Sequence, residues 1–197
     1  MSSESRPPRG YKPVGVRLRR ADPHGPWAAT LWAVDMDCPV PSRGDAECLA
    51  DPSHIPPVEG CGCGWRVFFD RERIVSLVLA RRWALTHGSF VAASTLWGSV
   101  TEGETGAVGS AGRVDHIWAP PCLCGGRAVA VRPVDPLTFS FRRPLARALR
   151  WLRLWVRRPD LLGWFPTYPV CRRHADPLAV PLGELSQLLG VPVSPLP

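Results

Sequence analysis

The chain has 197 residues, of which 45% are apolar, so it is long enough and apolar enough to bury a core. Its 24 basic side chains exceed its 17 acidic ones, and the net charge is +7. No stretch approaches the roughly 20 uninterrupted apolar residues of a membrane span. The first residues lack the apolar core of a signal peptide. We therefore expect a cytoplasmic protein with no transmembrane segment.

The first third of the chain predicts strands followed by a long loop. Residues 1–12 are expected to form a flexible basic tail. Alternating apolar and polar residues predict a strand at 14–18, and β-branched and aromatic residues predict a second at 27–34. Residues 38–64 are dense in Cys, Pro, Gly and Asp, which is typical of a loop.

The middle of the chain predicts a helix and a hairpin. Residues 65–69 are mostly apolar and predict either a short strand or the entry to a helix. Asp70 is placed to cap a helix over residues 71–85, because apolar residues follow it at helical spacing. Strands at 90–100 and 113–118 flank a Glu-Gly-Glu-Thr-Gly turn and predict an antiparallel pair.

The last third predicts shorter elements. Residues 129–132 form a further expected strand. Pro144 and Pro159 are placed to begin and end a helix, because proline fits the first helical turn and stops a helix that precedes it. A final helix is expected near residues 182–189 and ends at Gly190.

Strands and helices are interspersed without a βαβ order, which favours an α+β fold. We expect a small, mainly antiparallel sheet or a partly open barrel with zinc-bound loops. Two segments are expected after the tail. Residues 13–120 form the α+β core with the first Cys/His loop, and residues 121–197 form a zinc-ribbon-like module that carries an arginine-rich helix.

A repeated Cys-x-Cys-Gly pattern is the strongest chemical signal in the sequence. Cys61-Gly62-Cys63-Gly64 recurs as Cys122-Leu123-Cys124-Gly125. Seven cysteines in a reducing cytoplasm are not expected to form disulfides. Two thiolates from one turn can bind one zinc ion, and the glycine permits a positive φ. The pattern therefore predicts about two Zn²⁺ sites.

Each turn needs two further ligands to complete a tetrahedral set. For the first site we expect Cys48, His54, Cys61 and Cys63, and for the second Cys122, Cys124, Cys171 and His174. Cys171 and His174 have a Cys-x-x-His spacing, which presents two ligands from one turn. His116 is an alternative ligand, although an alternating strand more often holds an ordinary hydrogen-bonded histidine. Cys38 is isolated and is expected to be a small buried residue.

The ligand sets favour structural over catalytic zinc. Catalytic zinc keeps an open position and usually has His and carboxylate ligands, whereas these sets are rich in thiolate and complete. The His-x-Glu and Pro-Cys-x-x-Cys pair of zinc deaminases is absent, as are the nucleophile-elbow, phosphate-loop and His-Glu-x-x-His motifs. We expect no enzyme. A metalloenzyme with one unusual site is the less favoured alternative.

The segment from Phe141 to Arg158 carries seven arginines and no acid. If it is helical, one face presents a stripe of arginines at steps of 3 and 4, namely Arg143, Arg147, Arg150, Arg153 and Arg157. Such a stripe can bind the phosphates of DNA or RNA, an anionic membrane surface or an acidic protein. It can equally be a solvated helix face without a binding role. The chain has a single lysine, so arginine is its usual basic residue everywhere.

Three motifs carry a resemblance to a group of small uncharacterised proteins of actinobacteria and their phages. They are His54-Ile55-Pro56-Pro57, Cys61-Gly62-Cys63-Gly64 and Leu96-Trp97-Gly98-Ser99-Val100 with its following turn. The closing Leu188-Leu189-Gly190-Val191-Pro192 is also similar to the ends of these proteins. The group supplies no activity to carry over. Separately, residues 122–174 resemble a generic zinc ribbon, except that the first pair is Cys-x-Cys instead of Cys-x-x-Cys.

The sequence thus favours a zinc-stabilised binding or regulatory protein that contacts nucleic acid or a nucleoprotein partner. A protein–protein adaptor with structural zinc is the second hypothesis. Salt-dependent association with arbitrary DNA or RNA distinguishes the two, because phosphate contacts release counterions.

Overall fold

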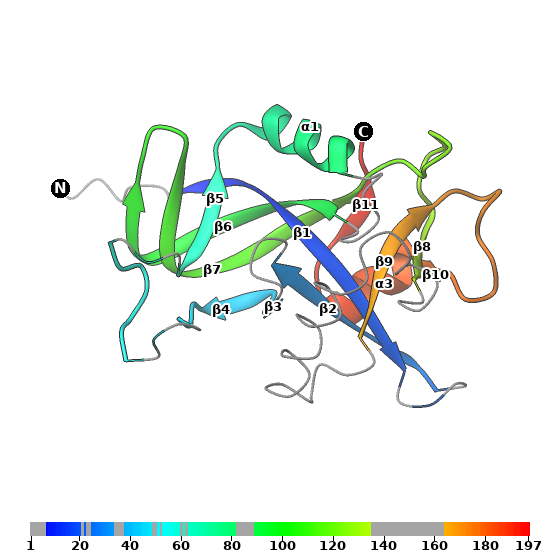
Figure 1. The fold of residues 1–197 in the computed structure, drawn as a ribbon, viewed down its shortest axis with the longest axis horizontal. Helices are drawn as coiled ribbons and strands as arrows, with labels where there is room; N and C mark the ends of the chain where they lie inside the picture. Colours follow the sequence, from blue (N-terminus) through cyan, green and yellow to red (C-terminus); the bar gives the residue numbers. More distant parts are fainter. Residues whose placement is uncertain are drawn as a thin grey trace, which may run out of the picture.

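The computed structural model describes residues 7–20, 22, 25–33, 38–48, 51, 53–59, 61, 63–81, 89–134 and 164–197. Within these residues the chain forms an 11-stranded, mostly antiparallel sheet with two short helices, α1 (Arg71–Arg81) and α3 (Leu182–Leu189) (Figure 1). The strands are β1 (Arg9–Arg20), β2 (Trp27–Ala33), β3 (Cys38–Val40), β4 (Arg43–Asp45), β5 (Trp65–Phe68), β6 (Ser89–Glu102), β7 (Gly106–Ala119), β8 (Ala130–Pro133), β9 (Phe165–Val170), β10 (Val180–Pro181) and β11 (Val193–Pro195).

Strand β1 connects most of the sheet, because it pairs along both of its edges. Its first half pairs with β6 and, at Tyr11, with β5. Its second half pairs with β2 and, at Arg17 and Leu18, with β9. The expected flexible tail over residues 1–12 is therefore wrong for residues 9–12. Residues 9–12 pair with β6, so β1 begins before residues 14–18, whose alternating pattern predicted the strand.

The hairpin of β6 and β7 forms the other main part of the sheet. The two strands pair antiparallel along most of their length, and β7 pairs along its other edge with β5, β4 and β11. The contacts β1–β6, β6–β7, β7–β5 and β5–β1 form a closed circuit of pairs. Strand β11 runs parallel to β7 and is the exception to the antiparallel pattern. The expected mainly antiparallel sheet is confirmed.

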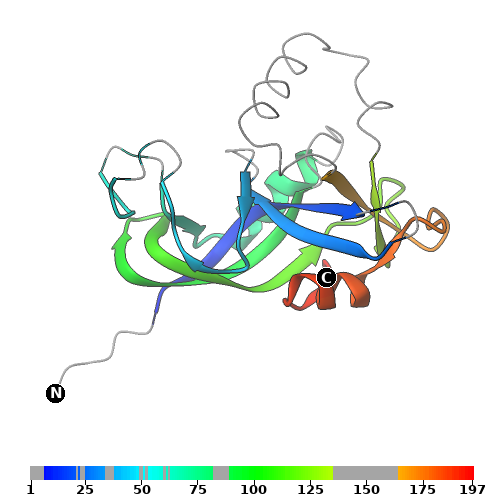
Figure 2. The ribbon, with the colours of Figure 1, turned by 90° about the horizontal axis from the view of Figure 1, so that it is seen from below.

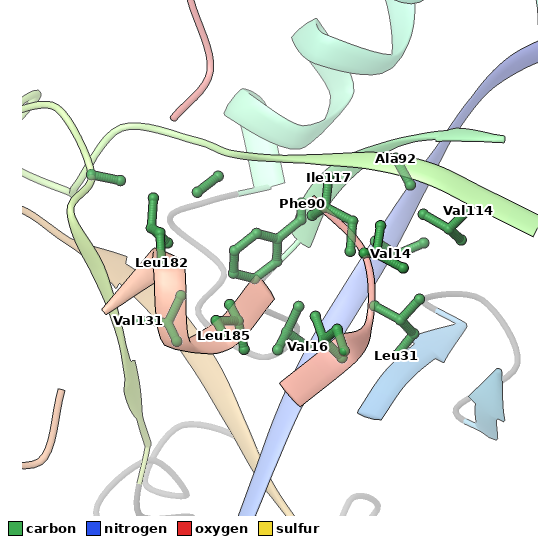
Figure 3. Packing of buried hydrophobic residues seen from close by; sticks show 14 of the residues in the cluster. Val14, Val16, Leu31, Phe90, Ala92, Val114, Ile117, Val131, Leu182 and Leu185 are labelled. Atoms are coloured by element: carbon green, nitrogen blue, oxygen red, sulfur yellow. The ribbon is translucent and has the colours of Figure 1, made fainter. Parts of the chain in front are cut away.

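Part of the core lies between the sheet and α3. Phe90 and Ile117, both fully buried, point from β6 and β7 toward Leu185 of α3, and Val16 approaches from β1 (Figure 3). Apolar side chains at helical spacing place one face of α3 on this core, since Leu182, Leu185 and Leu189 are its buried residues. Burial of this face holds the C-terminal part of the chain against the first strands.

One end of each helix lies where the sequence predicts it. Asp70 Oδ1 accepts a hydrogen bond from the backbone N–H of Arg73 at 2.9 Å, which is a helix N-cap. Helix α3 ends at Gly190, whose φ of 63° lies in the left-handed region that glycine adopts without strain. The predicted helix over 71–85 is described only as far as Arg81.

A β-bulge explains the Leu-Trp-Gly-Ser-Val motif. The register of β6 against β7 shifts between Trp97 and Val100, and Gly98 there has a φ of +77°. Ser110 Oγ accepts a hydrogen bond from the backbone N–H of Ser99 at 2.9 Å. A Cβ atom on Gly98 would collide with that hydroxyl. Glycine is therefore required at this position by both backbone conformation and space.

Several elements were not expected from the sequence. Strands β3 and β4 lie inside the predicted loop, and β9, β10 and β11 lie in Pro-rich segments without strand-like alternation. The sheet also crosses the expected boundary at residue 120, because β9 pairs with β1 and β11 pairs with β7. The predicted arginine helix at 141–158 lies outside the described residues.

The two Cys/His loops lie at opposite ends of the molecule (Figures 1 and 2). The first precedes β5, and the second is formed by the segments after β7 and β9, beyond the paired ends of β8 and β9. Among the helices of the described part of the chain, none is long and apolar enough to cross a membrane.

Candidate metal centres

The first cluster contains the four residues that the sequence predicts: Cys48, His54, Cys61 and Cys63. Each offers one ligand atom, and these atoms all lie within 4.8 Å of one another. The Sγ atoms of Cys48 and Cys61 are 3.7 Å apart, and His54 Nε2 is 3.2 Å from Cys63 Sγ. The cysteines are free thiols, so the cluster holds no disulfide. These four side chains could hold a metal ion.

The loop that carries this cluster is fixed by the sheet at both ends. Cys48 follows β4 and Cys63 precedes β5, and both strands pair with β7. Gly64 has a φ of +108°, as the Cys-x-Cys-Gly pattern predicts. Its Cα also faces Val108 so closely that a Cβ atom would lie 2.7 Å from the valine side chain. The glycine therefore lets the metal loop lie directly on β7.

Asp51 supports the first cluster from outside the ligand set. Its Oδ2 lies 3.7 Å from His54 Nδ1, the ring nitrogen opposite the one that faces Cys63. Its backbone N–H points at Cys48 Sγ at 3.3 Å. Hydrogen bonds from the Ser53 hydroxyl and N–H hold the pKa of the Asp51 carboxyl below its usual value. An ionised Asp51 at this position favours the His54 orientation in which Nε2 faces Cys63.

The second cluster contains Cys122, Cys124, Cys171 and His174, again as the sequence predicts. Their ligand atoms also lie within 4.8 Å of one another. Cys124 Sγ and Cys171 Sγ are 3.6 Å apart, and His174 Nδ1 lies 3.3 Å from Cys122 Sγ and 3.5 Å from Cys171 Sγ. Here the histidine presents Nδ1, whereas His54 presents Nε2.

Strands β8 and β9 bring the two halves of the second cluster together. They pair antiparallel with Ala130 opposite Val170, so the segment before β8 meets the segment after β9. Each segment turns tightly. Gly125, with a φ of +86°, donates its N–H to the Cys122 carbonyl, and His174 donates its N–H to the Cys171 carbonyl. The positive φ expected for this glycine is confirmed.

Local hydrogen bonds lower the pKa of Cys122 and Cys171, whereas the neighbouring thiols of Cys171 and Cys122 raise the pKa of Cys124. Burial raises the pKa of the Cys122 thiol, but the backbone N–H groups of Cys124 and Cys171 and the His174 ring outweigh it and lower the pKa to about 6. The pKa of His174 is raised, because the sulfurs of Cys122 and Cys171 stabilise the imidazolium. Cysteine binds metal as thiolate, so the lowered pKa of Cys122 suits a metal ligand, whereas His174 must lose its proton before Nδ1 can bind.

Other predicted candidates do not join these clusters. His116 Nε2 lies 2.8 Å from Ser194 Oγ and its ring packs on Trp118, so it behaves as the ordinary hydrogen-bonded histidine. The Cys38 side chain lies outside the described residues. So do Arg143, Arg147, Arg150, Arg153 and Arg157, and the stripe they would form stays a prediction.

Sequence reasoning missed the residues that surround the clusters. Asp51 lies three positions before His54, and this spacing gives a carboxylate partner for the imidazole. Around the second cluster lie Arg127, which follows the Cys-x-Cys-Gly turn, and Arg172 and Arg173, which separate the last two ligands. Of these residues, only Arg172 and Arg173 could have been found from the sequence. The Cys-x-x-His spacing places them between two ligands and therefore beside the site.

The comparisons with known proteins give no match for the chain: no family model, curated protein or solved structure is similar to it.

Proposed function

We propose that both clusters bind Zn²⁺. The observation that carries this proposal is the spacing of the ligand atoms. Tetrahedral zinc, with Zn–S bonds of about 2.3 Å and a Zn–N bond of about 2.0 Å, separates two sulfurs by about 3.8 Å and a sulfur from a nitrogen by about 3.5 Å. The shortest separations are 3.6 and 3.7 Å between sulfurs and 3.2 to 3.5 Å between sulfur and nitrogen, and all ligand atoms of each cluster lie within 4.8 Å of one another.

Both zinc ions are structural in this proposal. Three thiolates and one imidazole complete the four positions of tetrahedral zinc, and no position remains for water or substrate. Each ion would join segments that are distant in sequence, 13 positions apart for Cys48 and Cys61 and 47 for Cys124 and Cys171. Metal binding then contributes directly to the free energy of folding.

The protein so stabilised is a non-enzymatic binding protein with a regulatory role, and we propose that it contacts nucleic acid or a nucleoprotein partner. Support comes from charge: 24 basic against 17 acidic side chains, nearly all of the basic ones arginine. Arginine binds phosphates in a bidentate manner that lysine cannot match. At the second centre, three exposed arginines adjoin the ligands.

A protein–protein adaptor is the second candidate, and one observation favours it. Ile55 follows the ligand His54 directly and is 83% exposed, and Val58 in the same loop is 37% exposed. A large apolar side chain held outward by a metal loop is suited to a partner's apolar pocket. In this reading the first centre presents the contact.

Two measurements test the proposal. Elemental analysis of the purified protein should give about two zinc ions per chain. Fluorescence anisotropy with labelled single-stranded and duplex oligonucleotides should show association that weakens steeply with salt. Two zinc ions without any nucleic-acid binding at low salt would favour the adaptor, and absence of metal would contradict the zinc proposal itself.

A further inference from the structure

A hollow of about 1060 Å³ lies beside the second metal centre. Three arginines line it, Arg127 from the segment after Cys124 and Arg172 and Arg173 from the turn between Cys171 and His174. All three are exposed. The convergence of the proposed metal ligands thus also brings to one hollow three arginines from two segments about 45 positions apart in the chain.

The hollow carries an excess of positive charge. Among the described residues, Arg127, Arg172 and Arg173 make no ion pair with a carboxylate. The acid close to them in sequence, Asp176, is already engaged, because its Oδ2 lies 2.9 Å from Arg132 Nε. Zinc with three thiolates retains one negative charge, which three guanidinium groups exceed. The remaining charge is suited to an anion.

The other walls of the hollow are apolar. Ala128 and Leu182 are buried, Val129 and Pro195 are half-buried, and all four line the hollow. A ligand that fills it therefore combines a charged group with a flat or apolar one. A nucleotide has this composition, with a phosphate for the arginines and a base for the apolar wall. A duplex presents its phosphates on a convex surface, whereas a single strand can turn a base into a concave site.

We propose that this hollow binds a nucleotide unit of single-stranded nucleic acid, with the phosphate on Arg127, Arg172 and Arg173. The inference rests on the proposed nucleic-acid function and assigns it a site within the described residues. The second metal centre positions the site, because it fixes the turn that carries Arg172 and Arg173 against the turn that precedes Arg127.

The test uses the full-length, zinc-loaded protein and labelled single strands of about 12 nucleotides, DNA and RNA. Arg127→Glu, Arg172→Glu and Arg173→Glu are compared singly with Arg9→Glu, which makes the same change of net charge. Arg9 is exposed and is the first residue of β1. It is a control for charge alone, because β9, which leads to the second centre, pairs with the other end of β1. Each hollow variant should weaken binding roughly tenfold or more. Each should also lower the slope of log affinity against log salt by about one unit.

Arg9→Glu should leave both quantities close to wild type. Arg172→Lys should recover the salt slope but not the full affinity, because lysine keeps the charge and loses the bidentate geometry. Zinc content and melting temperature of every variant show whether it is folded.

Three results would overturn the inference. If wild type binds single strands and the hollow variants behave like Arg9→Glu, the site lies elsewhere and the proposed function stands. If duplex binds as tightly as single strands and its binding depends on the same arginines, the proposed preference for single-stranded nucleic acid is wrong. If wild-type protein binds no nucleic acid at low salt but binds an acidic or phosphorylated peptide, the inference and the proposed function both fail.

Discussion

Cys124 and Cys171 are 47 positions apart in the chain, and their sulfur atoms lie 3.6 Å apart. This separation is too long for a disulfide, whose sulfurs are about 2.05 Å apart, and close to the edge of a zinc tetrahedron. A metal ion bound between these sulfurs, as proposed, would close a long loop. Each half of the second centre would then depend on the other for its position.

Replacing Cys171 by Ser should remove one zinc ion per chain and lower the melting temperature by roughly 5 to 15 °C, because metal binding stabilises the folded state alone. Limited proteolysis should increase between residues 125 and 170. Elemental analysis, calorimetry and mass mapping of the fragments measure the three effects. Cys38→Ser is the matched control and should keep both ions. Unchanged melting and cleavage in Cys171→Ser would show that the second centre is not structural.

Asp51→Asn should weaken zinc binding at the first centre about tenfold, the lower end of the usual effect of such a partner, because Asp51 is exposed. The amide no longer offers a charge to His54 Nδ1, although the ligand set stays complete. Competition with a chromogenic chelator measures the affinity of each centre. Ser53→Ala, which keeps the carboxylate, should have the smaller effect. Equal affinities in Asp51→Asn and wild type would mean that the carboxylate does not support the histidine.

Gly126→Ala should weaken the second centre, again by about tenfold. A Cβ atom there would lie 3.0 Å from Cys171 Cβ and 3.2 and 3.4 Å from the sulfurs of Cys171 and Cys124. Gly183→Ala is the control, because a Cβ atom at that helical position meets nothing within 4 Å. It should keep both metal affinities and stabilise the protein slightly, since alanine favours a helix. Full zinc affinity in Gly126→Ala would show that the ligands have more space than the geometry implies.

Gly98→Ala should lower the free energy of unfolding by about 2 kcal/mol or more, because a left-handed conformation costs alanine about 1 to 2 kcal/mol and its Cβ also displaces Ser110. Denaturant unfolding measures the change. Gly103→Ala in the same hairpin has space for a Cβ atom and should be far milder. Ser110→Ala on the Gly98→Ala background should recover part of the loss by removing the clash. If Gly98→Ala and Gly103→Ala are equally stable, the β-bulge does not require glycine at position 98.

His116 should titrate below its usual value, because burial lowers the pKa of its ring. The unfolded chain then binds more protons than the folded one around pH 6, so this group's contribution to stability is lost as the pH falls below about 6.5. A ring-proton titration by NMR measures the pKa directly. His116→Asn should show a smaller loss of stability between pH 7 and 5.5 than wild type. A pKa above 6.5 for His116 would contradict this.

The ligands were predictable because their chemistry is local. Cys61 with Cys63, and Cys122 with Cys124, each come from one turn, and Cys-x-x-His spacing joins Cys171 to His174. The helix that ends at Gly190 and the β6–β7 hairpin also carry local signals, in periodicity and turn residues.

The rest depends on contacts between distant segments. Strand β9 begins at Phe165 and has prolines within it, so its pairing with β1 at Arg17 leaves no periodic pattern in the sequence. Strand β11 is short and aligned by β7. Likewise, Arg127 and Arg172 line one hollow because the Cys/His residues beside them converge. No spacing within either segment predicts a hollow between them.

X-ray absorption at the zinc edge of the purified protein, combined with its metal content, tests the central claim most directly. Two zinc ions per chain, each with three sulfurs at about 2.3 Å and one nitrogen at about 2.0 Å, are the predicted result. Zinc below one ion per chain, or a first shell dominated by oxygen, would contradict the account.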